Sequence, residues 1–408
     1  MRGPLAAVCK ARSVVLGVQR GGDRLRVALD ATPLIGPRTG VGRFCHGALG
    51  ALGQRAELDV GAFAVTWRRR SWLTPLVPHG VHVRQRAMPA RPLHMLWARR
   101  TWPAMEWFLG ALDVVHGTNF VVPPTRRAAR VVTVHDLTAL RFPELCDRAS
   151  LAFPRMVVRA IAEGAWVHTP SRFVADEVVT ELGADPARVR VVYHGAPAVT
   201  SELGQAELFR DPRRARDAPR SLPAGTSRYV LAVGTVEPRK DYAGLVRAFE
   251  RVAGAHDDVS LVIAGGDGWG ASAFHDAVEG SRWRARIVQL GYLSDGVLAR
   301  WLAGADVLAF PSVYEGFGFP PLEAMAAGVP VVATAAGAVP EIVGDAAVVV
   351  APSNVDDLAA ALDAVLSDRG GAVVAELVAK GRCRAARYTW EACAGGLSAL
   401  YTDAAAAT

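Results

Sequence analysis

Apolar, β-branched runs of strand length alternate along most of the chain with helix-length segments that mix apolar and polar residues. In the first half we expect strands at 25–30, 59–65, 113–116, 130–134, 165–169 and 189–193, and a first helix at about 42–52. Strands that alternate with helices form parallel sheets covered on both faces. This half therefore predicts a doubly wound α/β unit.

The alternation stops between about 198 and 227, where Arg, Asp, Pro and Gly dominate, as is typical of an exposed linker. It restarts with strands at 229–233, 260–264, 287–290, 307–310 and 329–332 and helices near 241–254, 294–303 and 321–327. We predict two doubly wound domains, at 25–198 and 228–385, joined by a linker at 199–227. Open α/β sheets bind ligands at the carboxyl ends of their strands, so a ligand cleft is expected where the domains face each other.

Composition excludes several classes of protein. The 408 residues are 51% apolar and 21% charged, which is the usual globular mix and argues against a disordered or fibrous chain. The five cysteines are odd in number and lack C-x-x-C spacing, so we expect neither a disulfide framework nor a structural zinc site, but a reducing cytosol. No run approaches the roughly 18 apolar residues of a membrane span, and residues 1–24 are interpreted as a poorly ordered extension.

Charge is divided unevenly between the halves. Residues 1–200 carry 27 Lys and Arg against 14 Asp and Glu, a balance of +13, whereas residues 201–408 carry 19 against 25, a balance of −6. A basic half can attract nucleic acid, anionic lipid or a phosphorylated acceptor, or can simply be a solvated face. No nucleic-acid motif accompanies it, so we expect no nucleic-acid partner.

The first candidate site is the segment Gly234-Thr235-Val236-Glu237-Pro238-Arg239-Lys240, which follows a buried strand and leads into a helix. Arg239 offers a planar fork of donors and Lys240 a compact charge, a combination that suits a diphosphate. We expect both side chains to face solvent and to add little to stability. The alternative interpretation is a solvated turn.

The second candidate site is the segment 310–330, a strand followed by a glycine-containing loop and a helix. Glu315 lies on the loop, Gly316 and Gly318 let the backbone approach a ligand, and Glu323 is expected at the start of the helix. Two carboxylates eight residues apart at such a corner can accept hydrogen bonds from hydroxyls of a sugar and a ribose. Alternatively, Glu323 only complements the helix dipole in its first turn.

Two further candidates lie in the first half. His135, with Asp136, ends an apolar strand, where an imidazole can hydrogen-bond a substrate hydroxyl or a phosphate oxygen, or can be purely structural. Gly40 and Gly42 stand in the loop between the first strand and the first helix. Their G-x-G spacing lacks the third glycine of a dinucleotide-binding loop, so it resembles a phosphate loop only weakly.

Together these residues resemble glycosyltransferase family 4, over essentially residues 25–403. Glu315 and Glu323 are similar to the E-x7-E motif of that family, and the segment 234–240 is similar to its phosphate loop. The resemblance implies the GT-B fold, in which two Rossmann-like domains face a cleft. It also implies that a last helix, here 386–403, crosses back to pack on the first domain.

The resemblance further implies a retaining, metal-independent transfer of a sugar from a nucleotide donor, without a cofactor. Arg239 and Lys240 would hold the diphosphate, Glu315 the sugar hydroxyls and Glu323 the ribose. His135 would contact the transferred sugar, and Gly40, Gly42 and Gly234 would admit the donor. Phe317 and Gly318 would offer backbone N–H groups. Thr235 and Val236 stand where relatives often have another basic residue, so phosphate binding depends on the two remaining cations.

The identity of the substrates is a separate expectation. The phosphate loop resembles that of mannosyltransferases of cell-envelope polysaccharide assembly, so we expect GDP-mannose as donor, with UDP- or dTDP-sugars as alternatives, and a glycan or lipid-linked acceptor. A GT-B epimerase or phosphorylase, or a non-catalytic nucleotide-sugar-binding protein, are the competing functions. The basic balance of residues 1–200, with the segment Trp67-Arg68-Arg69-Arg70-Ser71-Trp72, favours a peripheral contact with the anionic inner face of a membrane.

Overall fold

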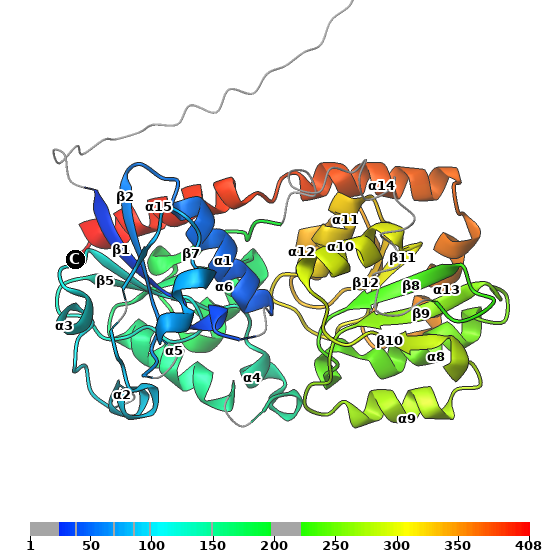
Figure 1. Ribbon diagram of the computed structural model, residues 1–408, viewed down its shortest axis with the longest axis horizontal. Helices are drawn as coiled ribbons and strands as arrows, with labels where there is room; N and C mark the ends of the chain where they lie inside the picture. The colour runs from blue at the N-terminus through cyan, green and yellow to red at the C-terminus, as the bar shows by residue number, and fades with distance from the viewer. Residues whose placement is uncertain are drawn as a thin grey trace, which may run out of the picture.

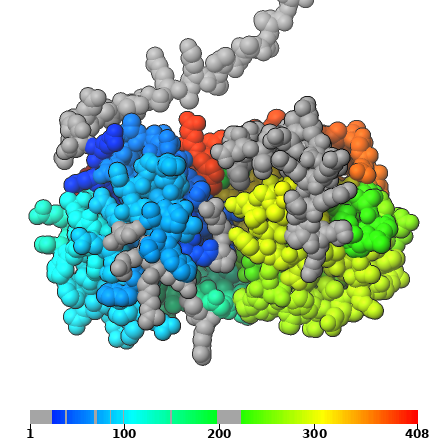
Figure 2. All heavy atoms as spheres, in the orientation of Figure 1, coloured from blue at the N-terminus to red at the C-terminus, as the bar shows by residue number. Residues whose placement is uncertain are grey.

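The computed structural model describes residues 24–36, 39–67, 70–84, 86–97, 99–147, 150–196 and 222–408. Their strands form two fully parallel sheets, one in each half of the chain (Figure 1). The predicted extension at 1–24 and the predicted linker at 199–227 lie outside the described residues, apart from residue 24 and residues 222–227. The two domains pack side by side and touch along a seam (Figure 2).

The first sheet has seven strands in the order β3-β2-β1-β4-β5-β6-β7. They are β1 (Leu25–Asp30), β2 (Leu58–Phe63), β3 (His82–Val83), β4 (Val114–Gly117), β5 (Ala129–Thr133), β6 (Trp166–Thr169) and β7 (Val189–Val191). Side chains of successive residues in a strand point to opposite faces. Val27 and Leu29 accordingly join one buried cluster and Ala28 another, so that helices cover both faces.

The second sheet has six strands in the order β10-β9-β8-β11-β12-β13. They are β8 (Arg228–Val233), β9 (Val259–Ala264), β10 (Ile287–Gln289), β11 (Val307–Phe310), β12 (Val331–Thr334) and β13 (Val348–Val350). In both sheets the strand order reverses beside the first strand of the domain, between β1 and β4 and between β8 and β11. Ligands of open α/β sheets bind at such reversal points.

Helices connect the strands of both domains. In the first domain they are α1 (Gly40–Leu52), α2 (Ala90–Trp97), α3 (Glu106–Leu109), α4 (Thr138–Arg141), α5 (Phe153–Ala162) and α6 (Arg172–Leu182). In the second they are α8 (Tyr242–Val252), α9 (Ser272–Gly280), α10 (Asp295–Gly304), α11 (Phe319–Ala327), α12 (Val339–Val343), α13 (Val355–Ser367) and α14 (Ala372–Ala385). Side-chain caps define several starts: the Ser171 side chain accepts from the Val174 N–H at α6, and Asp241 accepts from the Gly244 N–H at α8.

The last helix, α15 (Trp390–Ala406), returns to the first domain and packs on α1, β4 and β5, whereas α14 lies along the second domain (Figure 1). Gly47 of α1 makes this contact close, because a Cβ there would lie 2.2 Å from the Trp390 ring. The predicted fold class, two doubly wound domains with a C-terminal helix that crosses back, is confirmed.

Two strands were missing from the sequence prediction, β3 and β13. They have two and three residues and lie at sheet edges, where one neighbour suffices and little apolar sequence is needed. The helix starts also shift: α11 begins at Phe319, so Glu323 is its fifth residue and not in its first turn. The interpretation of Glu323 as a dipole partner of the helix start is therefore wrong.

Candidate active site between the two domains

The loop after β11 docks on the carboxyl ends of the first sheet. Gly316 packs so closely on the His135 backbone that a Cβ would lie 1.8 Å from the His135 carbonyl oxygen. The Ser171 hydroxyl donates to the Gly316 carbonyl at 2.9 Å, and the Leu137 N–H donates to the Tyr314 hydroxyl at 3.0 Å. Two of the segments singled out in the sequence are thus in direct contact across the domain boundary.

A cluster of ion pairs surrounds Glu315. Arg239 Nη1 lies 2.8 Å from Glu315 Oε2, Lys240 Nζ donates to Oε1 at 2.5 Å, and the Ser312 hydroxyl donates to the same oxygen at 2.7 Å. Burial alone would raise the pKa of Glu315, but Arg239 and Lys240 outweigh it and lower that pKa to about 2. Glu315 is therefore ionised and acts only as a hydrogen-bond acceptor.

The cations of this cluster are not in solvent, contrary to the sequence expectation. Lys240 is 8% exposed and lies in a short 3-10 turn at 238–240, held against Glu315. Arg239 also pairs with Glu237 at 2.7 Å and donates to the Tyr314 carbonyl at 2.9 Å. Burial would lower the pKa of Arg239, but Glu315 and Glu237 raise it, so the guanidinium remains charged. Two cations and two carboxylates make the cluster neutral overall.

Glu323 also has a charged partner, from the other domain. It is 6% exposed and forms an ion pair with Arg43 of α1, 280 residues away. Arg43 lies 3.7 Å from Asp295 as well. Burial would lower the pKa of Arg43, but Glu323 outweighs it and raises that pKa. The second carboxylate of the motif is thus close to the start of α1, where Gly40 and Gly42 lie.

His135 provides a neutral imidazole at the same edge. Its Nε2 lies 2.8 Å from the Thr118 carbonyl, which only accepts, so Nε2 carries the proton and Nδ1 is an acceptor. Among the described residues no donor lies within hydrogen-bond distance of Nδ1. Burial lowers the pKa of His135, which keeps the ring uncharged. A hydroxyl group can donate to this nitrogen.

Three more histidines at this edge escaped the sequence analysis. His116 and His168 lie near the carboxyl ends of β4 and β6, and His194 lies in the segment after β7. All three are fully or almost fully buried, and together with His135 they surround Phe44. His116 and His168 both lie within 2.8 Å of the Thr133 hydroxyl. Each follows a run of apolar strand residues, as His135 does, so the same sequence pattern could have identified them.

His194 differs from its neighbours because neither ring nitrogen has a hydrogen-bond partner among the described residues. Its ring stacks on Phe44 with centroids 4.3 Å apart and on Phe319 at 5.4 Å, and lies 4.9 Å from Phe317. Burial lowers its pKa well below the usual range. The Phe317 side chain thus serves packing between the domains.

The remaining predicted residues are glycines and backbone groups. Gly234 has φ +144° and a Cβ there would lie 3.2 Å from Lys240 Cε, so glycine leaves room for the cation. Gly318 has φ +121° and caps α11. Among the described residues no acceptor lies within hydrogen-bond distance of the Phe317 and Gly318 N–H groups. Gly40 opens α1, where a Cβ would lie 3.7 Å from the Phe319 ring, and Gly42 is buried in its first turn.

A cavity of about 190 Å³ adjoins this cluster at the domain boundary. Asp136, Thr138 and Ser150 of the first domain line it together with Glu237, Arg239 and Trp269 of the second. Polar acceptors beside an exposed indole suit the hydroxyls and the apolar ring face of a sugar. Trp269 was not singled out in the sequence, because it lies in a loop without a recognisable pattern.

Among the described residues, no group of three or more His, Cys, Asp or Glu side chains is arranged to hold a metal ion. No helix in the described part combines the length and the apolar character needed to cross a bilayer.

Comparisons with known proteins cover both domains. A model of glycosyltransferase family 4 matches residues 38–198, and a model of glycosyl transferases group 1 matches residues 214–382. The O-antigen chain mannosyltransferase B of Escherichia coli is 30% identical over 284 residues, 69% of this chain and 71% of that one. A D-inositol 3-phosphate glycosyltransferase of Mycobacterium tuberculosis is 30% identical over 318 residues, 72% of this chain and 62% of that one.

Solved structures resemble the whole architecture. Anabaena HepE, in a complex with UDP and glucose, matches 93% of this chain and 100% of its own with a TM-score of 0.68 at 17% identity. Sucrose-phosphate synthase from Thermosynechococcus elongatus matches 94% and 100% with a TM-score of 0.69 at 20% identity. At 17% and 20% identity, these structures show that the fold is shared.

Proposed function

Since this chain belongs to glycosyltransferase family 4 and has the GT-B fold, we propose that its interdomain cluster transfers a sugar from a nucleotide diphosphate donor with retention of configuration. The observation that carries this proposal is that Glu315 pairs with Arg239 and Lys240 while the next residue, Gly316, packs on the His135 backbone. Charges suited to a diphosphate thereby lie beside a neutral acceptor suited to a hydroxyl.

Donor binding exchanges the partners within this cluster. The diphosphate oxygens take over the donors of Arg239 and Lys240, because a doubly charged anion attracts both cations more strongly than a single carboxylate does. Glu315 is then released to accept from the sugar hydroxyls, and its low pKa keeps it ionised. The free N–H groups of Phe317 and Gly318, at the start of α11, point to a further contact with the sugar or the phosphate.

The ribose and the transferred sugar take the remaining groups. Glu323 accepts from the ribose hydroxyls near Gly40 and Gly42, and Arg43 keeps it charged. His135 Nδ1 accepts a hydrogen bond from a hydroxyl of the transferred sugar. The leaving diphosphate takes the proton of the attacking acceptor hydroxyl on the same face of the sugar, while Arg239 and Lys240 stabilise its charge. The acceptor sugar occupies the neighbouring cavity beside Trp269.

The proposed donor is GDP-mannose. The support is the similarity to a protein named as an O-antigen chain mannosyltransferase, together with the phosphate-loop sequence. Thermal stabilisation and hydrolysis across GDP-, UDP- and dTDP-sugars test this directly, because a ligand that binds the native state raises its stability. If a UDP- or dTDP-sugar stabilised the chain more, or were hydrolysed faster, than GDP-mannose, that sugar would replace GDP-mannose as the proposed donor. Retention is tested by the anomeric configuration of the product, measured by NMR.

The acceptor is proposed to be lipid-linked, at an anionic membrane. Large apolar side chains are exposed over a short stretch of the first domain: Trp67, Trp72, Met95, Trp102 and Trp107 are between 53% and 66% exposed. Indoles favour the membrane interface, and the +13 balance of residues 1–200 favours anionic lipid. Arg68 and Arg69 lie outside the described residues. Trp102 and Trp107, which were not part of the sequence hypothesis, are exposed and extend it.

Liposome pelleting tests the membrane contact. We expect binding to anionic vesicles that weakens with salt and with Trp102→Ser/Trp107→Ser, and little binding to neutral vesicles. The matched control is Trp269→Ser, which removes a partly exposed indole from the domain boundary. Equal recovery in the supernatant with both vesicle types would exclude membrane docking.

A further inference from the structure

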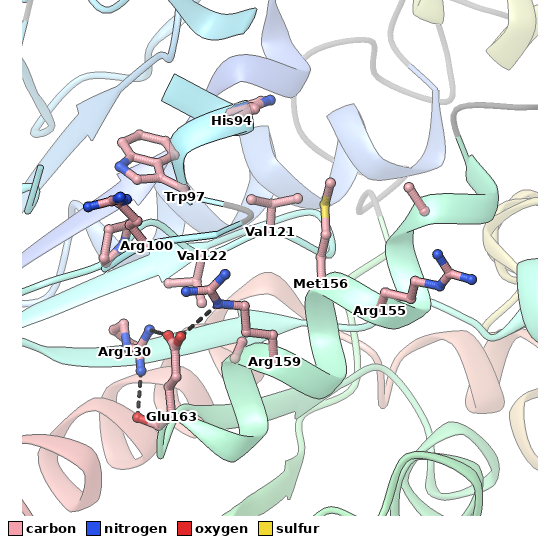
Figure 3. A pocket seen from close by; sticks show the side chains of 13 residues that line it. His94, Trp97, Arg100, Val121, Val122, Arg130, Arg155, Met156, Arg159 and Glu163 are labelled. Carbon is pink, nitrogen blue, oxygen red and sulfur yellow. Dashed lines mark hydrogen bonds and ion pairs between the residues drawn. The ribbon is translucent and has the colours of Figure 1, made fainter. Parts of the chain in front are cut away.

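A second cavity, of about 270 Å³, lies within the first domain and away from the ion-pair cluster. α2, α5 and the segment 121–124 line it (Figure 3). Its volume is slightly below the roughly 300 Å³ of the smallest drug-sized ligand pockets. It therefore fits the end of a ligand better than a whole one.

The lining combines an apolar floor with an excess of positive charge. Trp97, Val122 and Met156 contribute apolar surface. Four arginines and one glutamate also face the cavity, which leaves a net positive charge: Arg100, Arg130, Arg155, Arg159 and Glu163.

Glu163, the only carboxylate in this lining, already pairs with two of its arginines. Arg130 Nη1 lies 2.7 Å from Glu163 Oε2, and Arg159 Nε lies 2.7 Å from Oε1. Burial would raise the pKa of Glu163, but the two arginines outweigh it and lower that pKa, so the carboxylate stays ionised. Arg100 and Arg155 have no ion-pair partner within the described part of the chain. In Figure 3 Arg100 lies beside Trp97 on one side of the cavity and Arg155 on the opposite side.

Arginines without a carboxylate partner, on two sides of an apolar floor, are complementary to an anion that is covalently attached to a hydrocarbon. A free phosphate would leave the floor without a partner, and a neutral lipid would leave the guanidinium groups without one. We propose that this cavity binds the phosphate or diphosphate end of a lipid, together with its first apolar carbons. This inference rests on the proposed function, because the lipid is taken to be the carrier of the acceptor.

The position of the cavity agrees with that role. Ala152 and Met156 of the α5 region face it, whereas Phe153 and Val157 face the cavity at the domain boundary. Phe120 stacks on Phe153 with centroids 4.9 Å apart. The lipid phosphate thus lies on one side of α5 and the acceptor sugar on the other. Met95, on the same helix as Trp97, is exposed, so the cavity borders the proposed membrane-facing surface.

Binding of farnesyl diphosphate to the full chain, measured by calorimetry below its micelle concentration, tests the proposal. We expect binding of farnesyl diphosphate, at least tenfold weaker binding of inorganic diphosphate, and no binding of farnesol. Arg100→Ser/Arg155→Ser should weaken the lipid at least tenfold, and Ala152→Phe should do the same by narrowing the cavity without changing charge. Both arginines and Ala152 are exposed, so these variants are expected to fold.

The control is Arg284→Ser/Arg387→Ser, which removes the same charge from exposed positions outside the cavity and should leave lipid binding unchanged. Unchanged binding in Arg100→Ser/Arg155→Ser, with loss in Lys240→Ala, would place the lipid in the donor site and overturn the proposal. Equal affinity for inorganic diphosphate or for farnesol would also overturn it. No donor is present in this measurement, so its failure is distinguishable from failure of sugar transfer, which the nucleotide-sugar panel reports.

Discussion

The two sheets present opposite chemistry at the edges that face each other. The first sheet ends in four histidines that burial keeps neutral, because no carboxylate outweighs the cost of removing their charge from water. The second ends in Glu315, which is also buried but stays ionised because Arg239 and Lys240 lie within 2.8 Å. Burial alone does not decide ionisation; the partner does.

In the proposed function, this difference gives the two domains different roles. A diphosphate needs cations, and the second domain provides them in a dry cluster where electrostatic contacts are strong. A hydroxyl of the transferred sugar is proposed to donate to the neutral, oriented Nδ1 of His135. Two kinds of variant test this comparison: those that remove a charge from the edge of the second sheet, and those that replace a titratable histidine at the edge of the first.

Removal of a cation should have the largest effect. We expect Lys240→Ala to reduce kcat/KM by about 100- to 1,000-fold, the usual cost of losing one preorganised charge contact, with a smaller loss for Arg239→Ala. Because Lys240 is buried against Glu315, the same variant should lose about 1–3 kcal/mol of unfolding free energy. Steady-state kinetics and urea unfolding measure the two effects.

The control for this change is Lys380→Ala, since Lys380 pairs with Asp345 and Glu376 at the surface of the second domain. Its kinetics should equal those of the unmodified chain. Wild-type turnover in either Lys240→Ala or Arg239→Ala would contradict the phosphate assignment.

The two carboxylates of the motif should separate kinetically. Glu315→Gln should lower kcat and kcat/KM together, by roughly 100-fold, because its contacts with the sugar strengthen as the bond to the phosphate breaks. Glu323→Gln should mainly raise the donor KM, by about tenfold, since ribose contacts are the same before and during transfer. The reverse pattern would exchange their roles.

Acid should weaken the two edges in different pH ranges. Each histidine has a folded pKa below its unfolded value of about 6.5, so the unfolded chain binds more protons and stability falls as the pH drops below that value. Glu315, with a folded pKa of about 2, loses its contribution only as the pH falls from about 4.5 towards 2. As the pH falls, the histidine edge of the first sheet therefore loses its contribution to stability before Glu315 does.

Urea unfolding between pH 7.5 and 5 checks this order. His194→Phe keeps an aromatic ring between Phe44 and Phe319 but cannot titrate, so its stability should fall less steeply, by about 1.4 kcal/mol per pH unit below pH 6. An unchanged slope in His194→Phe would mean that this ring is protonated in the folded state.

Chelation should have no effect at all. We predict full transfer activity in EDTA, because the cations of the second edge, and not a divalent metal, are proposed to stabilise the leaving diphosphate. A loss of activity that Mg²⁺ or Mn²⁺ restores would transfer that role from the arginine and the lysine to a metal.

Local sequence determined most of the strands of this protein and the order of its motifs, but not the short edge strands β3 and β13. Strand and helix periodicity and the glycine-rich corners act over a few residues, so both doubly wound domains and the loops at 234–240 and 315–323 could be predicted without a structure. The strand-end histidine pattern was equally readable, although only His135 was singled out.

Tertiary structure alone decided which side chains meet. Arg43 and Glu323 are 280 residues apart and pair only because α1 and α11 face each other across the domain boundary. Lys240 was expected in solvent and is buried because the loop carrying Glu315 closes over it. The arginine-lined cavity joins α2, α5 and β5, which no local pattern connects. Burial and charge pairing depend on how segments far apart in the sequence pack together, and local periodicity does not show which distant segments will meet.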